Sequence, residues 1–253
     1  MCTIRIGTSG WSYDHWTGPF YPESLPGDRR LDFYAERFPT VEINNSFYRL
    51  PAEKTFKAWR GRVPGGFIFS VKASRYITHM KKLKDPSASL GKLMSRVRLL
   101  GHRLGPVLFQ LPPSWKFDSG RLQDFLETLD GKPQRYAFEF RDRSWLNDRC
   151  YRMLADHGAA LCVYHLAGFR SPRKLTADFT YVRLHGPGDA YQGRYDGRTL
   201  RGWAQVMSRW ASDDVDVYCY FDNDEAGYAP SDALRLAAML GLGSGRSAGR
   251  GTG

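Results

Sequence analysis

Residues 179–186 read FTYVRLHG, a run rich in β-branched and aromatic residues that ends on glycine. Such a run predicts a buried β-strand. Because successive side chains of a strand point to opposite faces, Val182 and Leu184 share one face, whereas Arg183 and His185 share the other. The stretch therefore predicts a strand that delivers a cation and an imidazole at its C-terminal end.

Seven other segments have a similar character and are bounded by Gly, Pro or polar residues. They are Thr3–Gly7, Thr40–Asn44, Phe67–Lys72, Pro106–Gln110, Tyr136–Phe140, Ala160–Tyr164 and Val215–Phe221. Apolar residues recur at helical spacing in the segments between and after them. These helical patterns cover residues 90–104, 122–129, 150–157, 200–210 and 231–240, whereas Ala167–Asp178 shows no convincing helix.

Alternating strands and helices at this spacing predict a parallel sheet with right-handed crossovers. Eight strands in about 240 residues favour closure into a TIM-barrel-like (β/α)8 barrel over an open doubly wound sheet. We therefore predict one domain over residues 1–240, followed by a flexible tail over residues 241–253 that consists mainly of Gly, Ser, Arg and Ala.

Composition restricts the class of protein. Of 253 residues, 42% are hydrophobic and 14% aromatic, which is enough for one large core. No apolar run is long enough to span a bilayer, and four widely separated cysteines fit a reducing cytoplasm, so we expect a cytoplasmic protein without a membrane partner. The net charge of +11 attracts anions such as nucleic acid or phosphorylated metabolites, although solubility alone also explains it.

Polar side chains gather at or just beyond the C-terminal ends of six predicted strands. In a closed barrel these ends meet at one mouth, where barrel enzymes keep their active sites. A structural plug of buried ion pairs is the alternative, but buried pairs contribute little to stability, so a ligand site is the favoured interpretation. The strand-end residues are Glu42, Asn44, Lys72, Gln110, Glu139, Arg141, Arg183, His185 and Asp222.

Each candidate residue is assigned a role by its chemistry. Glu139 or His185 is the predicted general acid–base, and Lys72 and Glu42 complete the catalytic set. The predicted anion-binding residues are Lys72, Arg141 and Arg183, with Arg75 and His79 in a basic loop that otherwise serves as a solvated face. The remaining predicted binding residues are Asn44 and Gln110 for hydroxyl groups, Trp11, Tyr48 and Trp145 for stacking, Gly186 and Gly188 as a backbone nest or a plain turn, and Asp222 and Asn223.

Several chemistries lack their sequence signals. The chain has no G-x-S-x-G, no P-loop and no H-E-x-x-H motif. We predict no cofactor and no metal, while a weak divalent-metal site from Glu139, His185 and Asp222 is left open.

The strand-end segments, taken in order, resemble the domain of unknown function 72 family (DUF72), also called YecE-like. The resemblance implies a TIM-barrel-like fold and no established reaction. Glu42, Lys72, Glu139, Arg183 and His185 keep the family pattern, whereas Asp142-Arg143, Tyr164 and Asp222 depart from it. The matching segments are IGTSGWSY at 6–13, FYP at 20–22, VEINNSFY at 41–48, VKASRYITH at 71–79, LFQLPP at 108–113, FEFR at 138–141, YVRLHG at 181–186 and YFDND at 220–224.

These observations favour an enzyme that acts on an anionic, phosphate-bearing sugar or nucleotide ligand at the barrel mouth, by acid–base hydrolase, lyase or isomerase chemistry. A non-catalytic barrel that binds nucleic acid is the competing interpretation, because the net charge is +11 and aromatic residues follow several strands. A glycosidase built on Glu42 and Glu139 is a third, which the separation of the two carboxylates tests.

Overall fold

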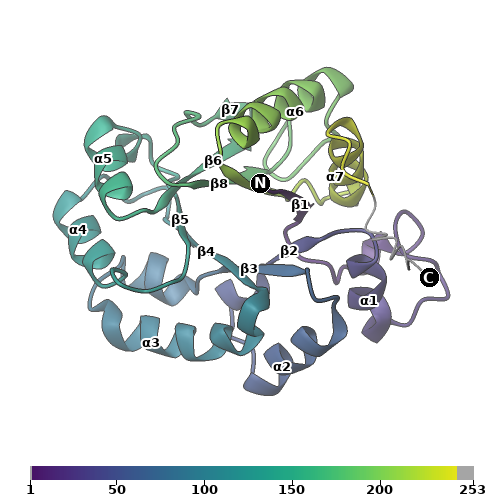
Figure 1. Cartoon of the computed structure of the whole chain (residues 1–253), viewed down its shortest axis with the longest axis horizontal. Helices are drawn as coiled ribbons and strands as arrows, with labels where there is room; N and C mark the ends of the chain where they lie inside the picture. The colour runs from purple at the N-terminus through teal and green to yellow at the C-terminus, as the bar shows by residue number, and fades with distance from the viewer. Residues whose placement is uncertain (1, 244–253) are drawn as a thin grey trace, which may run out of the picture.

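The computed structural model describes residues 2–243 and forms a nearly closed parallel barrel (Figure 1). Neighbouring strands follow the order β1-β9-β8-β6-β5-β4-β3-β2. A backbone bridge between Ser9 and Glu42 joins the two ends of this ring. The barrel strands are β1 (Ile4–Thr8), β2 (Thr40–Ile43), β3 (Ile68–Lys72), β4 (Leu104–Gln110), β5 (Tyr136–Glu139), β6 (Ala160–Leu166), β8 (Phe179–Leu184) and β9 (Asp216–Phe221). The predicted TIM-barrel-like fold is confirmed.

Helices lie around the outside of the ring and cover the outward faces of the strands (Figure 1). None of the helices within residues 2–243 combines the length and apolarity needed to cross a membrane. The α-helices are α1 (Arg30–Ala35), α2 (Glu53–Arg62), α3 (Pro86–Val97), α4 (Ser119–Glu127), α5 (Asp148–Asp156), α6 (Gly197–Ser212) and α7 (Tyr228–Met239).

The segment after β6 is the one crossover without an α-helix, as its sequence predicts. It forms the short strand β7 (Phe169–Arg170), which pairs antiparallel with the end of β6. The predicted helical stripe of residues 90–104 is α-helical only as far as Val97 and continues as a 3-10 helix over Arg98–Arg103. Gly101 has φ 61° and interrupts the helical conformation, and Leu104 already begins β4.

The sequence pattern predicts no helix between the first three strands, yet α1 and α2 lie there. α1 spans only 6 residues, so its buried Leu31, Tyr34 and Ala35 make a stripe of a single turn, and α2 buries Phe56 alone. The predicted tail of residues 241–253 lies outside the described residues from 244 onward, so its flexibility stays a prediction.

Two hydrophobic clusters fill the molecule. The larger packs the outward faces of the strands against the helices. The smaller is built from strand residues that include Cys162, Phe179 and Tyr218. Within it, the buried hydroxyl of Tyr220 bonds Thr40 (2.8 Å) and Ser70 (2.7 Å), so even this layer has its polar atoms paired. Charged residues then occupy the C-terminal end of the barrel, where the strands deliver them.

Candidate active site at the barrel mouth

Arg183, near the end of β8, is the centre of the mouth and is fully buried. Its Nη2 donates hydrogen bonds to Glu42 (2.8 Å), Asp222 (3.0 Å) and the hydroxyl of Ser9 (3.2 Å). Its Nη1 donates to Glu139 at 3.0 Å. One guanidinium therefore ties together three carboxylates that come from β2, β5 and the end of β9.

The two glutamates have further partners. Glu42 accepts hydrogen bonds from the hydroxyl groups of Ser9 and, at 2.7 Å, Tyr181. Glu139 accepts one from Nε of Arg141, which lies two residues further along the chain. Both carboxylates are completely buried. The centre of the mouth is thus a fully enclosed, hydrogen-bonded ion network.

In this network, neighbouring positive charges lower the pKa of the acids more than burial raises it. Burial alone would raise the pKa of Glu139, but the guanidinium groups of Arg141 and Arg183 hold that pKa well below its ordinary value. Burial likewise opposes ionisation of Asp222, yet Arg183 and His185 lower the pKa of its carboxyl. Both groups are therefore carboxylates at neutral pH, and neither is a proton donor there.

His185, directly after β8, is fully buried and bonded at both ring nitrogens. Nδ1 lies 3.0 Å from Asp222, and Nε2 lies 3.1 Å from Nη2 of Arg141. A guanidinium only donates hydrogen bonds, so we assign the lone pair to Nε2 and the proton to Nδ1, which donates to Asp222. The imidazole thus keeps its basic nitrogen on the side of Arg141.

Lys72 ends β3 and is only 7% exposed. Its Nζ lies 4.2 Å from the centre of the Phe47 ring, and no hydrogen bond or ion pair to it occurs within residues 2–243. Burial, and then the positive charge of Arg183, lower the pKa of the Lys72 amine to about 8. Lys72 is therefore a buried amine that forms no ion pair with any residue from 2 to 243.

A cavity of about 440 Å³ opens beside Arg141 at the ends of β4, β5 and β6. This volume falls within the range of small-molecule sites. The guanidinium of Arg141 also lies 5.2 Å from the centre of the Tyr164 ring, which lines the wall of the cavity. The lining residues are Gln110, Pro113, Arg141, Arg143, Tyr164, Leu166, Phe169 and Tyr191.

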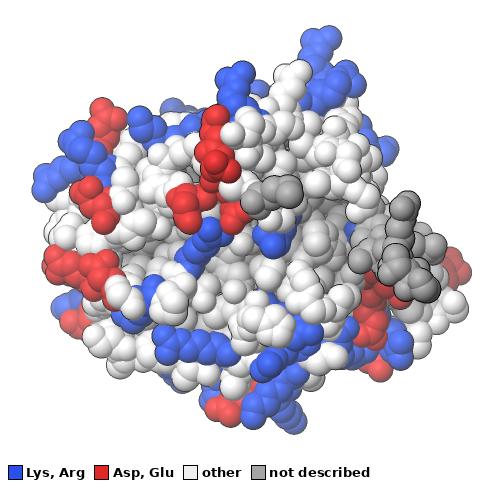
Figure 2. Space-filling view, viewed as in Figure 1, with Lys and Arg blue, Asp and Glu red and all other residues white. Residues whose placement is uncertain are grey.

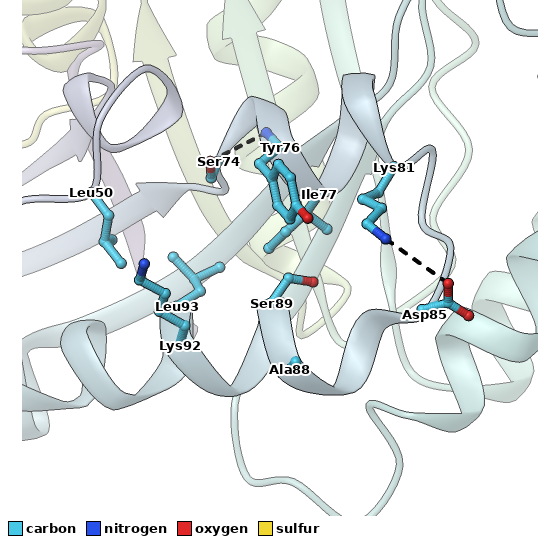
Figure 3. A pocket seen from close by; sticks show the side chains of 10 residues that line it. All are labelled: Leu50, Ser74, Tyr76, Ile77, Lys81, Asp85, Ala88, Ser89, Lys92 and Leu93. Carbon is cyan, nitrogen blue, oxygen red and sulfur yellow. Dashed lines mark hydrogen bonds and ion pairs between the residues drawn. The ribbon is translucent and has the colours of Figure 1, made fainter.

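A cavity of about 590 Å³ lies apart from the mouth network, between the segment after β3 and helix α3 (Figure 3). Figure 3 shows Lys81 directed to Asp85, at 3.9 Å, while Lys92 projects from α3. Asp85 and Lys92 are exposed and Lys81 is half-exposed, so this cavity has no desolvated charged group. We therefore assign the candidate site to the mouth.

Four predicted residues are exposed or half-buried near the mouth. Tyr48 is 72% exposed and Arg75 is exposed, whereas Asn44 and His79 are half-buried. Oδ1 of Asn44 is itself buried and has no hydrogen-bond partner within residues 2–243, so it is available to a ligand hydroxyl. Gln110 is 9% exposed and lines the 440 Å³ cavity. The ligand-binding roles of these residues stay predictions.

Neither predicted tryptophan platform presents an open ring face, and the ligand-stacking roles of Trp11 and Trp145 stay predictions. Trp145 is fully buried, stacks on Phe140 at 4.8 Å and donates its indole N–H to the Trp115 carbonyl. Trp11 is 9% exposed and packs edge-on against Trp59 at 5.1 Å. Both rings are part of the larger hydrophobic cluster.

Nη1 and Nη2 of Arg183 are bonded to carboxylates of the chain, and the predicted anion-binding role of this guanidinium stays a prediction. The backbone N–H of Gly186 donates to the hydroxyl of Tyr195 at 3.1 Å, and Gly188 is exposed, so the turn is not an open nest. Asn223 donates to the carbonyl of Gly193 and anchors a loop instead of facing the cavity.

The metal and glycosidase alternatives fit the geometry poorly. Within residues 2–243, no group of three or more His, Cys, Asp or Glu is placed to hold a metal ion. Oxygens of Glu139 and Asp222 are instead bonded to Arg183. The same guanidinium links Glu42 to Glu139, both fully buried, so no room is left between these carboxylates for a sugar ring.

Sequence reasoning missed four residues of the site. Tyr181 lies two residues before Arg183 on the same strand face, so its place could be derived from strand alternation. Ser9 follows β1 directly, and a polar residue at the end of a barrel strand is expected at the mouth. Arg143 and Tyr191 lie on loops, where no periodicity indicates direction; Tyr191 has a φ of 66°, unusual for a residue other than glycine.

Comparison with known proteins agrees with this architecture. The curated protein "UPF0759 protein YunF" of Bacillus subtilis is 26% identical over 273 aligned positions, which cover 94% of this chain and 95% of that protein. A crystal structure of a DUF72 family protein from Thermotoga maritima superposes with a TM-score of 0.85 at 29% identity, covering 94% of this chain and 99% of that one.

A second DUF72 family structure, from Enterococcus faecalis, has a TM-score of 0.81 at 18% identity and covers 95% of this chain and 96% of its own, which supports the fold. The family model described as "Protein of unknown function DUF72" matches residues 5–250. The match spans both the strand-end residues and the helices around them, and the chain therefore belongs to the DUF72 family.

Proposed function

We propose that this protein is an enzyme that acts on an anionic, phosphate-bearing sugar or nucleotide ligand at the C-terminal mouth of the barrel. One observation carries the proposal. Lys72, Arg75 and Arg143 form no ion pair within residues 2–243, whereas the acids at the centre of the mouth are already paired with Arg183. The mouth therefore has cationic groups that are available to bind a ligand anion.

The cavity beside Arg141 is the proposed place for the phosphate. Arg143 borders it and is exposed, with its guanidinium 4.7 Å from the centre of the Phe169 ring. A forked guanidinium suits phosphate oxygens because it donates two parallel hydrogen bonds. Gln110 and the rings of Tyr164 and Tyr191, which line the same cavity, would hold the neutral part of the ligand.

His185 is the better candidate for general acid–base than Glu139. The carboxyl of Glu139 is held ionised by two guanidinium groups, so it has no proton to donate. The imidazole carries one proton and one lone pair, and Asp222 fixes which nitrogen bears each. A ligand anion that draws Arg141 toward the cavity would uncover Nε2 for proton transfer.

Binding of a phosphate ester is the test of this proposal. We expect ribose 5-phosphate to raise the melting temperature of the protein by about 5–10 °C at one hundred times its dissociation constant, because such binding adds about 2.7 kcal/mol to a domain of this size. Arg143→Met should weaken the affinity about tenfold, since it removes a charge-assisted hydrogen bond. Scanning fluorimetry against ligand concentration measures both effects.

The matched control is Arg152→Met, which removes an exposed arginine from α5, outside the residues that line the cavity. Its titration curve should coincide with that of the parent. Sodium sulfate controls for the general stabilisation by excluded anions. Equal ribose 5-phosphate affinities of the parent and Arg143→Met would contradict the proposed phosphate site. A melting temperature that rises without saturation in both proteins would contradict it as well.

A non-catalytic nucleic-acid-binding barrel remains the second candidate, because Lys and Arg side chains gather over α2 and α3 (Figure 2). Lys81, Lys82 and Lys84 extend this basic character along the loop before α3. Binding through such groups falls steeply with salt, because each neutralised phosphate releases counterions. Reversing these three charges should flatten the salt dependence for a single-stranded oligonucleotide, and an unchanged slope would dismiss this candidate.

A further inference from the structure

We propose that Lys72 is a covalent nucleophile whose ε-amine condenses with the carbonyl carbon of an open-chain aldose or ketose phosphate to form an imine. The inference rests on the proposed function and narrows its ligand class to phosphate esters that carry an aldehyde or a ketone. It assigns Lys72 a second role beyond attraction of negative charge.

The surroundings of Lys72 are those of a reactive amine. The side chain is 7% exposed, and its Nζ lies 4.2 Å from the centre of the Phe47 ring, which is itself 8% exposed. The charges of Glu42, Asp222 and Glu139 oppose part of the fall in the pKa of Lys72, but these carboxylates are bonded to Arg183 and none forms an ion pair with Lys72 within residues 2–243. A lysine that served only the fold would be paired when buried this deeply.

Desolvation and a neighbouring cation are the two means by which proteins activate a lysine amine. Both act here, since burial and the charge of Arg183 lower the pKa of Lys72 to about 8. At pH 7.5, about one amine in four is then unprotonated, compared with about one in a thousand for an ordinary lysine. The nucleophilic form is present at neutral pH.

His79 is placed to move the protons that imine formation requires. Its ring packs against the same Phe47 ring, with 5.0 Å between the centroids, and Thr78 bonds its Nδ1 at 2.9 Å. Nε2 has no hydrogen-bond partner within residues 2–243. Burial and then the charge of Lys72 lower the pKa of His79, so the imidazole is neutral and can accept a proton.

The reaction needs only the carbonyl ligand and one proton from solvent. The lone pair of the neutral amine forms the C–N bond, the carbonyl π pair moves to oxygen, and a proton passes from nitrogen to that oxygen through His79, which gives a neutral carbinolamine. His79 then takes a proton from solvent and donates it to the hydroxyl group, which leaves as water while the nitrogen lone pair forms the C=N bond of a protonated imine. Its positive nitrogen withdraws electrons from the adjacent carbon, which favours isomerisation or carbon–carbon bond cleavage there.

Reductive trapping tests the inference directly. The parent protein is incubated with ribose 5-phosphate and sodium cyanoborohydride at pH 7.5, and the labelled lysines are located by peptide mass spectrometry. Cyanoborohydride supplies the hydride that converts the imine to a stable secondary amine. We expect Lys72 to be labelled at least about tenfold faster than an ordinary lysine, because its larger neutral fraction outweighs the weaker nucleophilicity of a weaker base.

Lys92 is the internal comparison, because it is exposed and lines the separate cavity of Figure 3. Lys92→Met should leave labelling of Lys72 unchanged, whereas His79→Gln should slow labelling of Lys72 several-fold at a ribose 5-phosphate concentration that saturates the variant. The mapping on the parent protein does not depend on whether Lys72→Met folds. Equal labelling of Lys72 and Lys92, or no label on Lys72, would overturn the inference.

The two proposals fail separately. If Arg143 still governs ribose 5-phosphate affinity while Lys72 stays unlabelled, the imine is excluded and the phosphate site stands. If Lys72 is labelled at a rate that Arg143→Met does not change, the amine is reactive toward carbonyls in general, and the proposed phosphate site is excluded instead.

Discussion

Arg183→Met should destabilise the protein more than any other single change at the mouth. The substitution keeps an unbranched apolar stem but leaves Glu42, Glu139 and Asp222 without the guanidinium that joins them. Removing one partner of a buried ion pair costs about 3–5 kcal/mol. In a domain of this size we expect the melting temperature to fall by about 10 °C or more, measured by calorimetry at pH 7.

The pH dependence of the stability of Arg183→Met shows whether unpaired carboxylates cause the loss of stability. Without Arg183, the buried carboxylates of Glu139 and Asp222 are protonated more easily, so the deficit relative to the parent should shrink as the pH falls from 7 to 5. Arg183→Lys, which keeps one charge but loses the fork, should be intermediate. A melting temperature of Arg183→Met within about 3 °C of the parent would show that the network does not hold the mouth together.

Lys72→Met should change the stability in the opposite direction from Arg183→Met and make the protein more stable. Burial of this amine lowers its pKa from 10.5 in an ordinary lysine to about 8. Between these two pH values the folded protein binds fewer protons than the unfolded chain, so the free energy of unfolding of the parent rises with pH in that interval. Below pH 8 the buried ammonium costs roughly 2–3 kcal/mol, and the variant, which lacks it, should then be the more stable protein.

Chemical denaturation at pH 7, 8, 9 and 10 measures this difference. The advantage of Lys72→Met should be greatest at pH 7 and should decrease steadily toward pH 10. Loss of more than about 1 kcal/mol at pH 7 would instead make Lys72 the structural partner of a carboxylate. That result would favour the interpretation of the mouth as a structural plug.

The sequence predicts the barrel and places several charged residues at its mouth, although Ser9, Arg143, Tyr181 and Tyr191 were not predicted. Alternation along residues 179–186 places Arg183 and His185 on one strand face, and both are buried together in the mouth. Eight strand patterns predict the closed sheet because parallel strands in a chain of this length have few other arrangements. These predictions depend on local periodicity, which the sequence displays directly.

The pairing of the charges was not predictable in the same way. Strand alternation shows that Glu42 and Arg183 face inward. It does not show that Arg183 bonds three acids while Lys72 has no ion pair within residues 2–243, because this pairing depends on how adjacent strands are rotated. Residues on loops were the least predictable. Trp145 follows β5 as a ligand-stacking residue would, yet it packs on Phe140, because loop conformation sets its direction.

The location of a bound phosphate ester tests the central claim most directly. Crystals of the protein soaked with ribose 5-phosphate should show the phosphate group against Arg141 and Arg143 in the cavity of about 440 Å³. A mouth that stays empty at a concentration that stabilises the protein, with the phosphate bound on another face, would contradict the account.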